Sequence, residues 1–487
     1  MPLRACGLTW ALLMASAAAA QLPASAALPA EIDAALLRAK LPRDAVVLLV
    51  ADADSRAPGP PRLSHRADTP VNPASLMKLV TTYAALDILG PAFVWTTPVY
   101  IEGPVQAGVL QGNLYLKGQG DPKLVVERLW LLLRRVQALG ITTVAGDIVL
   151  DRSAFDVAPQ SPADFDGEPA RPYNAAPDAL LVNYKSVLMT FTPDRSGGFA
   201  AIAYEPALAG VAMPSRVPLA LPPPGTDCGD WRAALKADFS DPAKLLFGGS
   251  YSAACGEKTW PLAYADPASF AARAVERLWR DLGGKLSGKV RGGLVPAALA
   301  PAFVATSPAL PEVVRDINKF SNNVMAQQLF LTLSWHAKGS GSFTGSRELL
   351  RQWWASRLGD ATAPLLDNGS GLSRSERISA RALASLLQLA WASPLMPELM
   401  ASLPLAGVDG TLRRLKNPAT TGLAHLKTGS LRDVLGIAGV VHAASGKRYV
   451  LVAIANHPNA AAARPVLEAL VQWASQDLPA PAAVQRP

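Results

Sequence analysis

Ser75 and Lys78 place a hydroxyl and an amine three residues apart at the start of an almost wholly apolar segment. Residues three apart in a helix have Cβ atoms about 5–6 Å from each other, so the amine can reach the hydroxyl oxygen. The only other charged residue between positions 74 and 89 is Asp87, which predicts a helix buried nearly all round. Burial lowers the pKa of a lysine, so Lys78 could serve as a general base toward Ser75. The alternative is a helix-capping serine beside a lysine that extends to solvent.

A second group of polar residues, Lys427 to Ser430, lies on a predicted strand near the C-terminal end of the chain. On a sheet edge, Lys427 and Thr428 could hold a substrate carboxylate, and Gly429 could let a substrate backbone come close. The backbone N–H of Ser430 is a candidate to join that of Ser75 as an oxyanion hole. A strand that ends in a turn glycine is the alternative.

Ser321, Asn322 and Asn323 form a third polar group, between two segments with helical periodicity. A serine and an amide two residues apart can face one cleft from a turn or an irregular helix start. The serine could then relay a proton, and Asn323 could orient the lysine or the substrate. In isolation, a helix N-cap with a spare asparagine explains the same pattern.

These residues must be positioned by the elements around them. The pattern predicts a buried strand at 45–53, the helix at 72–89, and further helices at 267–282, 310–335, 383–393 and 464–475. It predicts three antiparallel strands at 424–428, 435–442 and 449–456. Between residues 95 and 260, short β-rich runs alternate with Gly, Pro and Asp turns. At 487 residues the chain is expected to form two or more domains, an α/β (multidomain α+β) fold split by a β-rich insertion.

The N-terminus indicates export. A short cationic head, an apolar run and Ala18-Ala19-Ala20 before Gln21 predict a signal peptide over residues 1–20, with a membrane anchor as the alternative. Cleavage there removes Arg4 and lowers the formal net charge from +8 to +7. No run of Lys and Arg with interleaved aromatics is present, so nucleic acid is not an expected partner. The basic charge has two equally good explanations. One is peripheral association with a membrane or an anionic cell-wall polymer, and the other is solubility alone.

Two cysteines, Cys228 and Cys255, remain after cleavage. In an oxidising compartment such a pair usually forms a disulfide. The five histidines form no His-x-x-x-His pair, which disfavours a zinc hydrolase.

Taken together and in this order, the three motifs resemble the penicillin-recognising serine enzymes. The family most similar is the type-4, or class C low-molecular-mass, penicillin-binding proteins, which are D-alanyl-D-alanine carboxypeptidase/endopeptidases. The wide gap between Ser75 and Ser321 also resembles this family, which carries inserted domains there. The resemblance spans residues 30 to 475 and includes the segments 73–78, 118–122, 146–151, 367–373, 409–412 and 427–430.

The resemblance implies a role for each motif. Ser75 would be the acyl-ester nucleophile and Lys78 its general base. Ser321 would pass a proton to the leaving D-alanine, while Asn323, Lys427, Thr428, Gly429 and Ser430 would contact the substrate. One departure is Asn322, where aspartate is common in the family. The implied fold is a transpeptidase-like domain at 28–95 and 265–478, a β-rich insertion at 96–264 with the Cys228–Cys255 disulfide, and a tail at 479–487.

The expected activity is hydrolysis of D-Ala-D-Ala or D-Ala-meso-diaminopimelate bonds in peptidoglycan stem peptides, in the periplasm. β-Lactam antibiotics would acylate the same serine, and the family implies no metal or organic cofactor. The sequence leaves two alternatives open. One is a β-lactamase or esterase on the same scaffold, since the shared motifs do not separate these activities. The other is a non-catalytic protein that binds the cell wall.

Overall fold

The computed structural model describes residues 28–54, 59–223, 225–359, 363–415 and 417–477. The predicted signal peptide at 1–20 and the tail at 479–487 lie outside these residues. Within the described ranges, none of the helices combines the length and the apolar character needed to span a bilayer.

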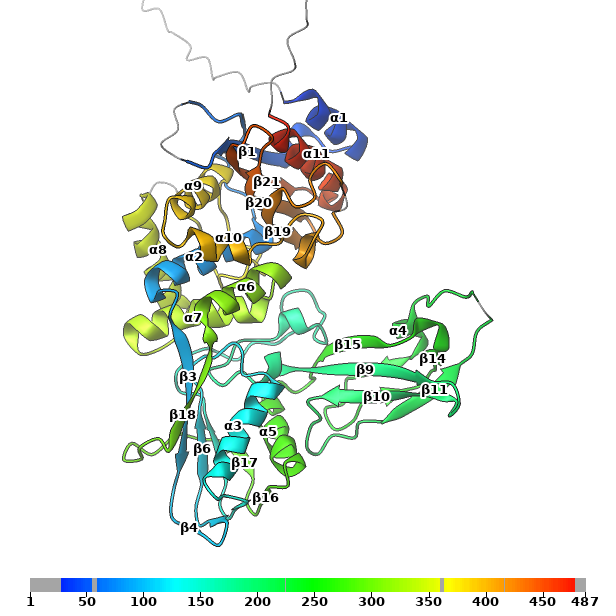
Figure 1. The fold of residues 1–487 in the computed structure, drawn as a ribbon, viewed down its shortest axis with the longest axis vertical. Helices are drawn as coiled ribbons and strands as arrows, with labels where there is room; N and C mark the ends of the chain where they lie inside the picture. The colour runs from blue at the N-terminus through cyan, green and yellow to red at the C-terminus, as the bar shows by residue number, and fades with distance from the viewer. Residues whose placement is uncertain (1–27, 55–58, 224, 360–362, 416, 478–487) are drawn as a thin grey trace, which may run out of the picture.

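A five-stranded antiparallel sheet forms the centre of the upper body in Figure 1. The sheet is buried on both faces because successive side chains of a strand point to opposite sides. In β1, Val47 and Leu49 face one core, whereas Val46, Leu48 and Val50 face the other. In spatial order the strands are β19 (Ala424–Leu431), β20 (Val434–His442), β21 (Arg448–Asn456), β1 (Val46–Asp52) and β2 (Leu63–His65).

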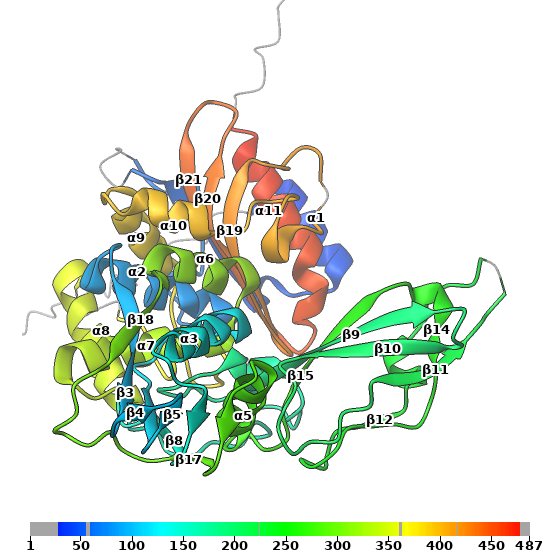
Figure 2. The ribbon, with the colours of Figure 1, turned by 60° about the horizontal axis from the view of Figure 1, so that its bottom comes forward.

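Helices cover both faces of this sheet (Figure 2). Two helices from the ends of the described chain, α1 (Ala30–Ala39) and α11 (Arg464–Ser475), share one apolar core with it. The predicted helix at 72–89 is present as α2 (Lys78–Leu89), and its residues from Lys78 to Leu86 are buried. The other helices on that side are α6 (Leu310–Phe320), α7 (Asn323–Lys338), α8 (Phe343–Leu358), α9 (Ala380–Trp391) and α10 (Met396–Ser402).

The inserted region contains a second body, seen at the bottom of Figure 1. Here β3 (Val94–Ile101) leads away from the body that holds the five-stranded sheet and pairs antiparallel with β18 (Phe303–Ala309), which leads back. Three strands between residues 285 and 309 pair with strands of this second body. The remaining elements are β4 (Val105–Gln106), β5 (Val109–Leu110), β6 (Leu114–Lys117), α3 (Val126–Ala138), β7 (Thr143–Val144), β8 (Ile148–Asp151), α5 (Phe270–Asp281), β16 (Lys285–Leu286) and β17 (Val290–Gly292).

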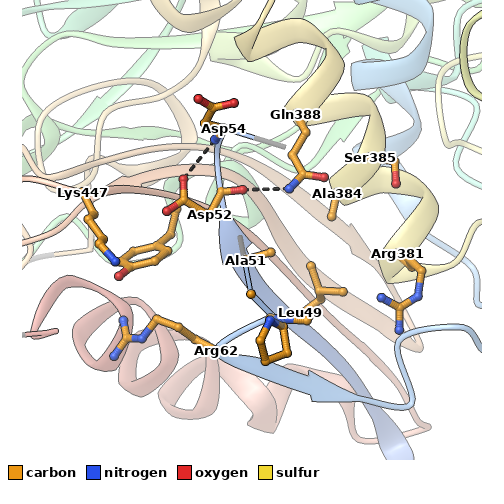
Figure 3. Close-up of a pocket in the computed structure, with 14 residues that line it drawn as sticks. Leu49, Ala51, Asp52, Asp54, Arg62, Arg381, Ala384, Ser385, Gln388 and Lys447 are labelled. Atoms are coloured by element: carbon orange, nitrogen blue, oxygen red, sulfur yellow. Dashed lines mark hydrogen bonds between the residues drawn. The ribbon is translucent and has the colours of Figure 1, made fainter. Parts of the chain in front are cut away.

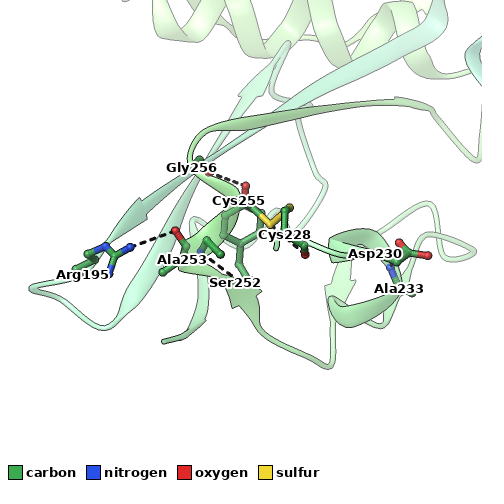
Figure 4. The surroundings of a disulfide bond; sticks show 10 residues. Arg195, Cys228, Asp230, Ala233, Ser252, Ala253, Cys255 and Gly256 are labelled. Carbon is green, nitrogen blue, oxygen red and sulfur yellow. Dashed lines mark hydrogen bonds between the residues drawn. A yellow bond between two sulfur atoms is a disulfide. The ribbon is translucent and has the colours of Figure 1, made fainter. Parts of the chain in front are cut away.

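A β-rich arm projects sideways from this body (Figure 1). It contains the Cys228–Cys255 disulfide that the sequence predicts (Figure 4). Next to the disulfide, the Tyr251 ring stacks on Phe191 with ring centroids 5.4 Å apart. The elements of the arm are β9 (Ser186–Asp194), β10 (Phe199–Glu205), β11 (Arg216–Ala220), α4 (Trp231–Ala234), β12 (Ala237–Asp238), β13 (Leu246–Phe247), β14 (Tyr251–Ser252) and β15 (Lys258–Ala263).

Candidate active site

Ser75 lies in a single 3-10 turn, Ala74–Met77, that runs directly into α2. Its side chain is partly exposed, whereas Lys78 is fully buried. Lys78 Nζ lies 2.9 Å from Ser75 Oγ, so the helical spacing brings the amine to the hydroxyl as the sequence predicts. The predicted alternative, in which the lysine extends to solvent, is therefore wrong.

Two further acceptors surround the Lys78 nitrogen. They are Asn323 Oδ1 at 2.6 Å and the backbone carbonyl of Ser370. A neutral amine has two N–H donors and one lone pair. It can therefore donate to these two oxygens while its lone pair accepts the proton of Ser75 Oγ. The three contacts thus fit both forms of the side chain, the ammonium group that donates to all three oxygens and the neutral amine that can act as a base.

Burial is also what makes the neutral amine accessible. It lowers the pKa of Lys78 from 10.5 to about 7, and the charge of Glu376 opposes this shift. A charged ammonium group without water is unfavourable, so the proton is held less tightly. At neutral pH a large fraction of Lys78 is therefore deprotonated.

Lys427 provides a second buried amine, on β19. Its Nζ donates to Ser321 Oγ at 2.9 Å and to the carbonyl of its neighbour Thr428 at 2.7 Å. Burial lowers its pKa well below the usual value, and the charge of Lys78 adds to this effect. Ser321 is thus linked to one of two closely placed lysines.

Ser321, Asn322 and Asn323 occupy the break between α6 and α7. Ser321 has a left-handed backbone (φ 57°) and ends α6. Asn322 caps α7, because its side chain accepts from the backbone N–H of Met325 at 3.0 Å. The predicted helix N-cap is therefore present at Asn322. Its two neighbours contact the two lysines, Ser321 with Lys427 and Asn323 with Lys78. Asn323 Nδ2 is anchored to the carbonyl of Tyr173 at 3.2 Å.

The strand end at Thr428, Gly429 and Ser430 lies against the turn that carries Ser75. A Cβ at Gly429 would come within 2.6 Å of the Pro73 carbonyl oxygen. Glycine is thus required at position 429 because the backbone of Pro73 lies directly against it. Thr428 Oγ1 donates to Thr411 Oγ1 at 2.8 Å, and Ser430 is exposed.

Several contacts at this site were not predicted from the sequence. They involve backbone carbonyls, as in Ser370 and Tyr173, or residues of segments 367–373 and 409–412, to which no role was assigned. Gly371 shows how closely the first of these segments packs. A Cβ there would lie 1.9 Å from the Ala74 carbonyl oxygen and 2.7 Å from Ser75 N.

Two cavities adjoin the candidate active site. One of about 290 Å³ is lined by Thr411, Thr428 and Ser430 among others, and another of about 380 Å³ by Ser321 and Asn323. A cavity of about 310 Å³ elsewhere, between β1 and α9, is lined by residues such as Arg62, Arg381 and Gln388 (Figure 3). The described residues that line it include none of the predicted site residues.

The sequence comparisons with known proteins find D-Ala-D-Ala carboxypeptidases. The sequence profile described as "D-Ala-D-Ala carboxypeptidase 3 (S13) family" matches residues 28–477. A D-alanyl-D-alanine carboxypeptidase of Actinomadura sp. (strain R39) is 31% identical over 407 residues, which are 77% of this chain and 71% of the relative.

Two solved structures, both of penicillin binding protein 4 (dacB) from Haemophilus influenzae, have similar folds. The first has a TM-score of 0.70 and 22% identity, and covers 91% of this chain and 97% of its own. The second, a complex with a β-lactam, has a TM-score of 0.68 and 23% identity, and the match covers 92% of this chain and 99% of that structure's chain. The predicted multidomain α/β fold and the predicted class of enzyme are confirmed. The chain belongs to the D-Ala-D-Ala carboxypeptidase 3 (S13) family of peptidases.

Proposed function

We propose that this protein hydrolyses D-Ala-D-Ala and related peptide bonds of peptidoglycan stem peptides through an acyl-enzyme on Ser75. The observation that carries the proposal is the position of Lys78 Nζ, 2.9 Å from Ser75 Oγ and 2.6 Å from Asn323 Oδ1. An alcohol becomes a strong nucleophile when a nearby base removes its proton during attack.

In the acylation step, Ser75 Oγ attacks the carbonyl carbon of the penultimate D-alanine while its proton moves to Lys78 Nζ. The carbonyl electrons move to oxygen, and the resulting oxyanion faces the backbone N–H groups of Ser75 and Ser430. Such preorganised donors stabilise the charge that develops in the transition state. Collapse of this intermediate re-forms the carbonyl and breaks the C–N bond.

The leaving D-alanine needs a proton at its nitrogen. Ser321 supplies it from its hydroxyl and is in turn reprotonated through the buried lysines. The 2.9 Å contact between Lys427 Nζ and Ser321 Oγ supports this route. Water then attacks the acyl-enzyme carbonyl while Lys78 accepts its proton, and the ester C–O bond breaks as Lys78 returns that proton to Ser75 Oγ.

The strand β19 binds the substrate. The substrate's terminal carboxylate favours the ammonium form of Lys427, which then faces it with a positive charge, and the hydroxyl of Thr428 donates to the same group. Asn323 contacts the peptide beside the scissile bond. The 2.8 Å link between Thr428 and Thr411 adds a second hydroxyl at the same place.

A β-lactam would enter by the same chemistry, because its strained amide presents a carbonyl and a carboxylate at similar positions. Export to the periplasm, with residues 1–20 removed, would bring the enzyme to its cell-wall substrate, on which its basic charge favours peripheral attachment. The relatives' printed names, a carboxypeptidase and a penicillin binding protein with a bound β-lactam, support the peptidase activity and the reaction with β-lactams.

The test is to incubate the mature protein separately with a stem pentapeptide and with a crosslinked muropeptide dimer, and to identify the products by mass spectrometry. Loss of one D-alanine from the pentapeptide is expected, and cleavage of the dimer would add endopeptidase activity. No product from either substrate, with folded protein, would contradict the proposal. Rapid steady-state turnover of nitrocefin, in place of a stoichiometric burst, would favour a β-lactamase instead.

A further inference from the structure

Glu376 lies outside the three motifs and is completely buried. One of its carboxylate oxygens, Oε1, accepts three backbone hydrogen bonds, from Asp367 N at 3.1 Å, Asn368 N at 3.2 Å and Gly369 N at 3.0 Å. Three successive N–H groups converge on one oxygen only if the backbone is curved around it. Glu376 therefore shapes the loop that runs from residue 367 to 371.

The same loop forms one wall around Lys78. The carbonyl of Ser370 accepts a hydrogen bond from Lys78 Nζ, and that of Gly369 accepts from Thr81 Oγ1 at 2.7 Å. Gly371 lies so close to Ala74 that a Cβ would clash with its carbonyl at 1.9 Å. The position of the Ser370 carbonyl, and with it one of the two N–H acceptors of Lys78, thus depends on the loop's shape.

The second carboxylate oxygen of Glu376, Oε2, is buried and has no hydrogen-bond partner among the residues that the structure describes. Burial raises the pKa of Glu376 to about 7, and the nearby carboxylate of Asp367 acts in the same direction. The charge of Glu376 in turn raises the pKa of Lys78, whereas Lys427 and Lys78 repel each other. The loop N–H groups thus occupy Oε1 alone, and the negative charge of a buried carboxylate is favourable only beside a compensating partner such as a lysine.

We propose that Glu376 is a positioning residue for the acylation reaction. Its carboxylate fixes the Ser370 carbonyl, and thereby the orientation of Lys78, and it supplies the negative charge that this buried lysine faces. The inference rests on the proposed function, since it concerns the base that activates Ser75.

Two substitutions separate these roles. Glu376→Gln keeps an oxygen that can accept the three N–H groups but removes the charge. Glu376→Ala removes the oxygen as well. Asp87→Asn is the matched control, because Asp87 is on the same helix as Lys78 and its carboxylate instead accepts from Trp353 and Arg357.

The measurement is the rate at which a fluorescent penicillin acylates the full mature protein, from acidic to alkaline pH. In Glu376→Gln the pH at which the rate falls to half should move toward acid by about one unit, because the ammonium form of Lys78 loses a favourable partner. In Glu376→Ala the rate should fall roughly tenfold or more at every pH, because the loop no longer orients the amine. Asp87→Asn should keep the wild-type profile.

An unshifted profile in Glu376→Gln, or a wild-type rate in folded Glu376→Ala, would overturn the proposal. If Glu376→Ala does not fold, the Glu376→Gln profile decides alone. Wild-type protein that is not acylated at all would instead overturn the proposed function, so the two failures are distinguishable.

Discussion

Lys78 Nζ lies 2.6 Å from Oδ1 of Asn323, a residue 245 positions further along the chain. The contact joins the first residue of α2 to the first residue of α7. The base of the proposed reaction is therefore held by two helices that meet at their N-terminal ends, and the geometry of Ser75 depends on how they pack.

The two neighbouring asparagines should differ when each is replaced by alanine. Asn323→Ala removes an acceptor of Lys78 and should lower the acylation rate about tenfold to a hundredfold. Asn322→Ala removes the cap of α7 and should lower the free energy of unfolding by about 1 kcal/mol while the acylation rate stays near that of wild type. Stopped-flow acylation and urea unfolding of both variants check this, and equal effects of the two substitutions would contradict it.

The acylation rate should depend on pH through Lys78. Its pKa is lowered to about 7, and only the neutral amine can accept the Ser75 proton. The rate should therefore be nearly constant above that pH and fall about tenfold per pH unit below it. A profile that shows no inflection between acidic pH and the ordinary lysine pKa of 10.5 would contradict the role of Lys78.

Gly429→Ala should disturb the site through the backbone. The new Cβ would lie 2.6 Å from the Pro73 carbonyl oxygen, so β19 and the Ser75 turn must separate. We expect a loss of about 1–3 kcal/mol in the free energy of unfolding, and slower acylation. Gly292→Ala is the control, because a Cβ there meets no atom of the described residues within 4 Å. Similar melting temperatures for the two variants would argue against this close packing.

The disulfide should stabilise the arm without taking part in catalysis. Cys228 and Cys255 are separated by 27 residues. Replacing both by serine should lower the stability by about 3–4 kcal/mol on the chain-entropy model. Guanidinium unfolding measures the loss, and the acylation rate of the folded variant should remain unchanged. A variant as stable as wild type would show that the bond does not constrain the unfolded chain.

Strong local patterns predicted much of the fold. Long apolar runs predicted the strands β1, β20 and β21, and a segment that is apolar on nearly every side predicted the helix α2. The helix α3 was missed inside a region predicted as β-rich, although its buried residues Leu129, Leu132, Leu133 and Val136 have helical spacing. The short β-rich runs on either side of it led to the prediction that the whole region is β-rich.

The candidate site was predictable only in part, for a physical reason. Ser75 and Lys78 are three residues apart, so a helix brings them together without reference to the rest of the fold. The Ser370 carbonyl is a backbone atom 292 residues from Lys78, and no residue type marks it. Glu376 acts on that carbonyl through three backbone N–H groups, so its contribution depends on a loop shape that only the folded chain defines.

The nucleophile itself is tested most directly by peptide mapping after incubation with benzylpenicillin. One covalent adduct per molecule is expected, on the peptide that contains Ser75, and no adduct is expected in a folded Ser75→Ala variant. An adduct on another residue, or one that persists in Ser75→Ala, would contradict it.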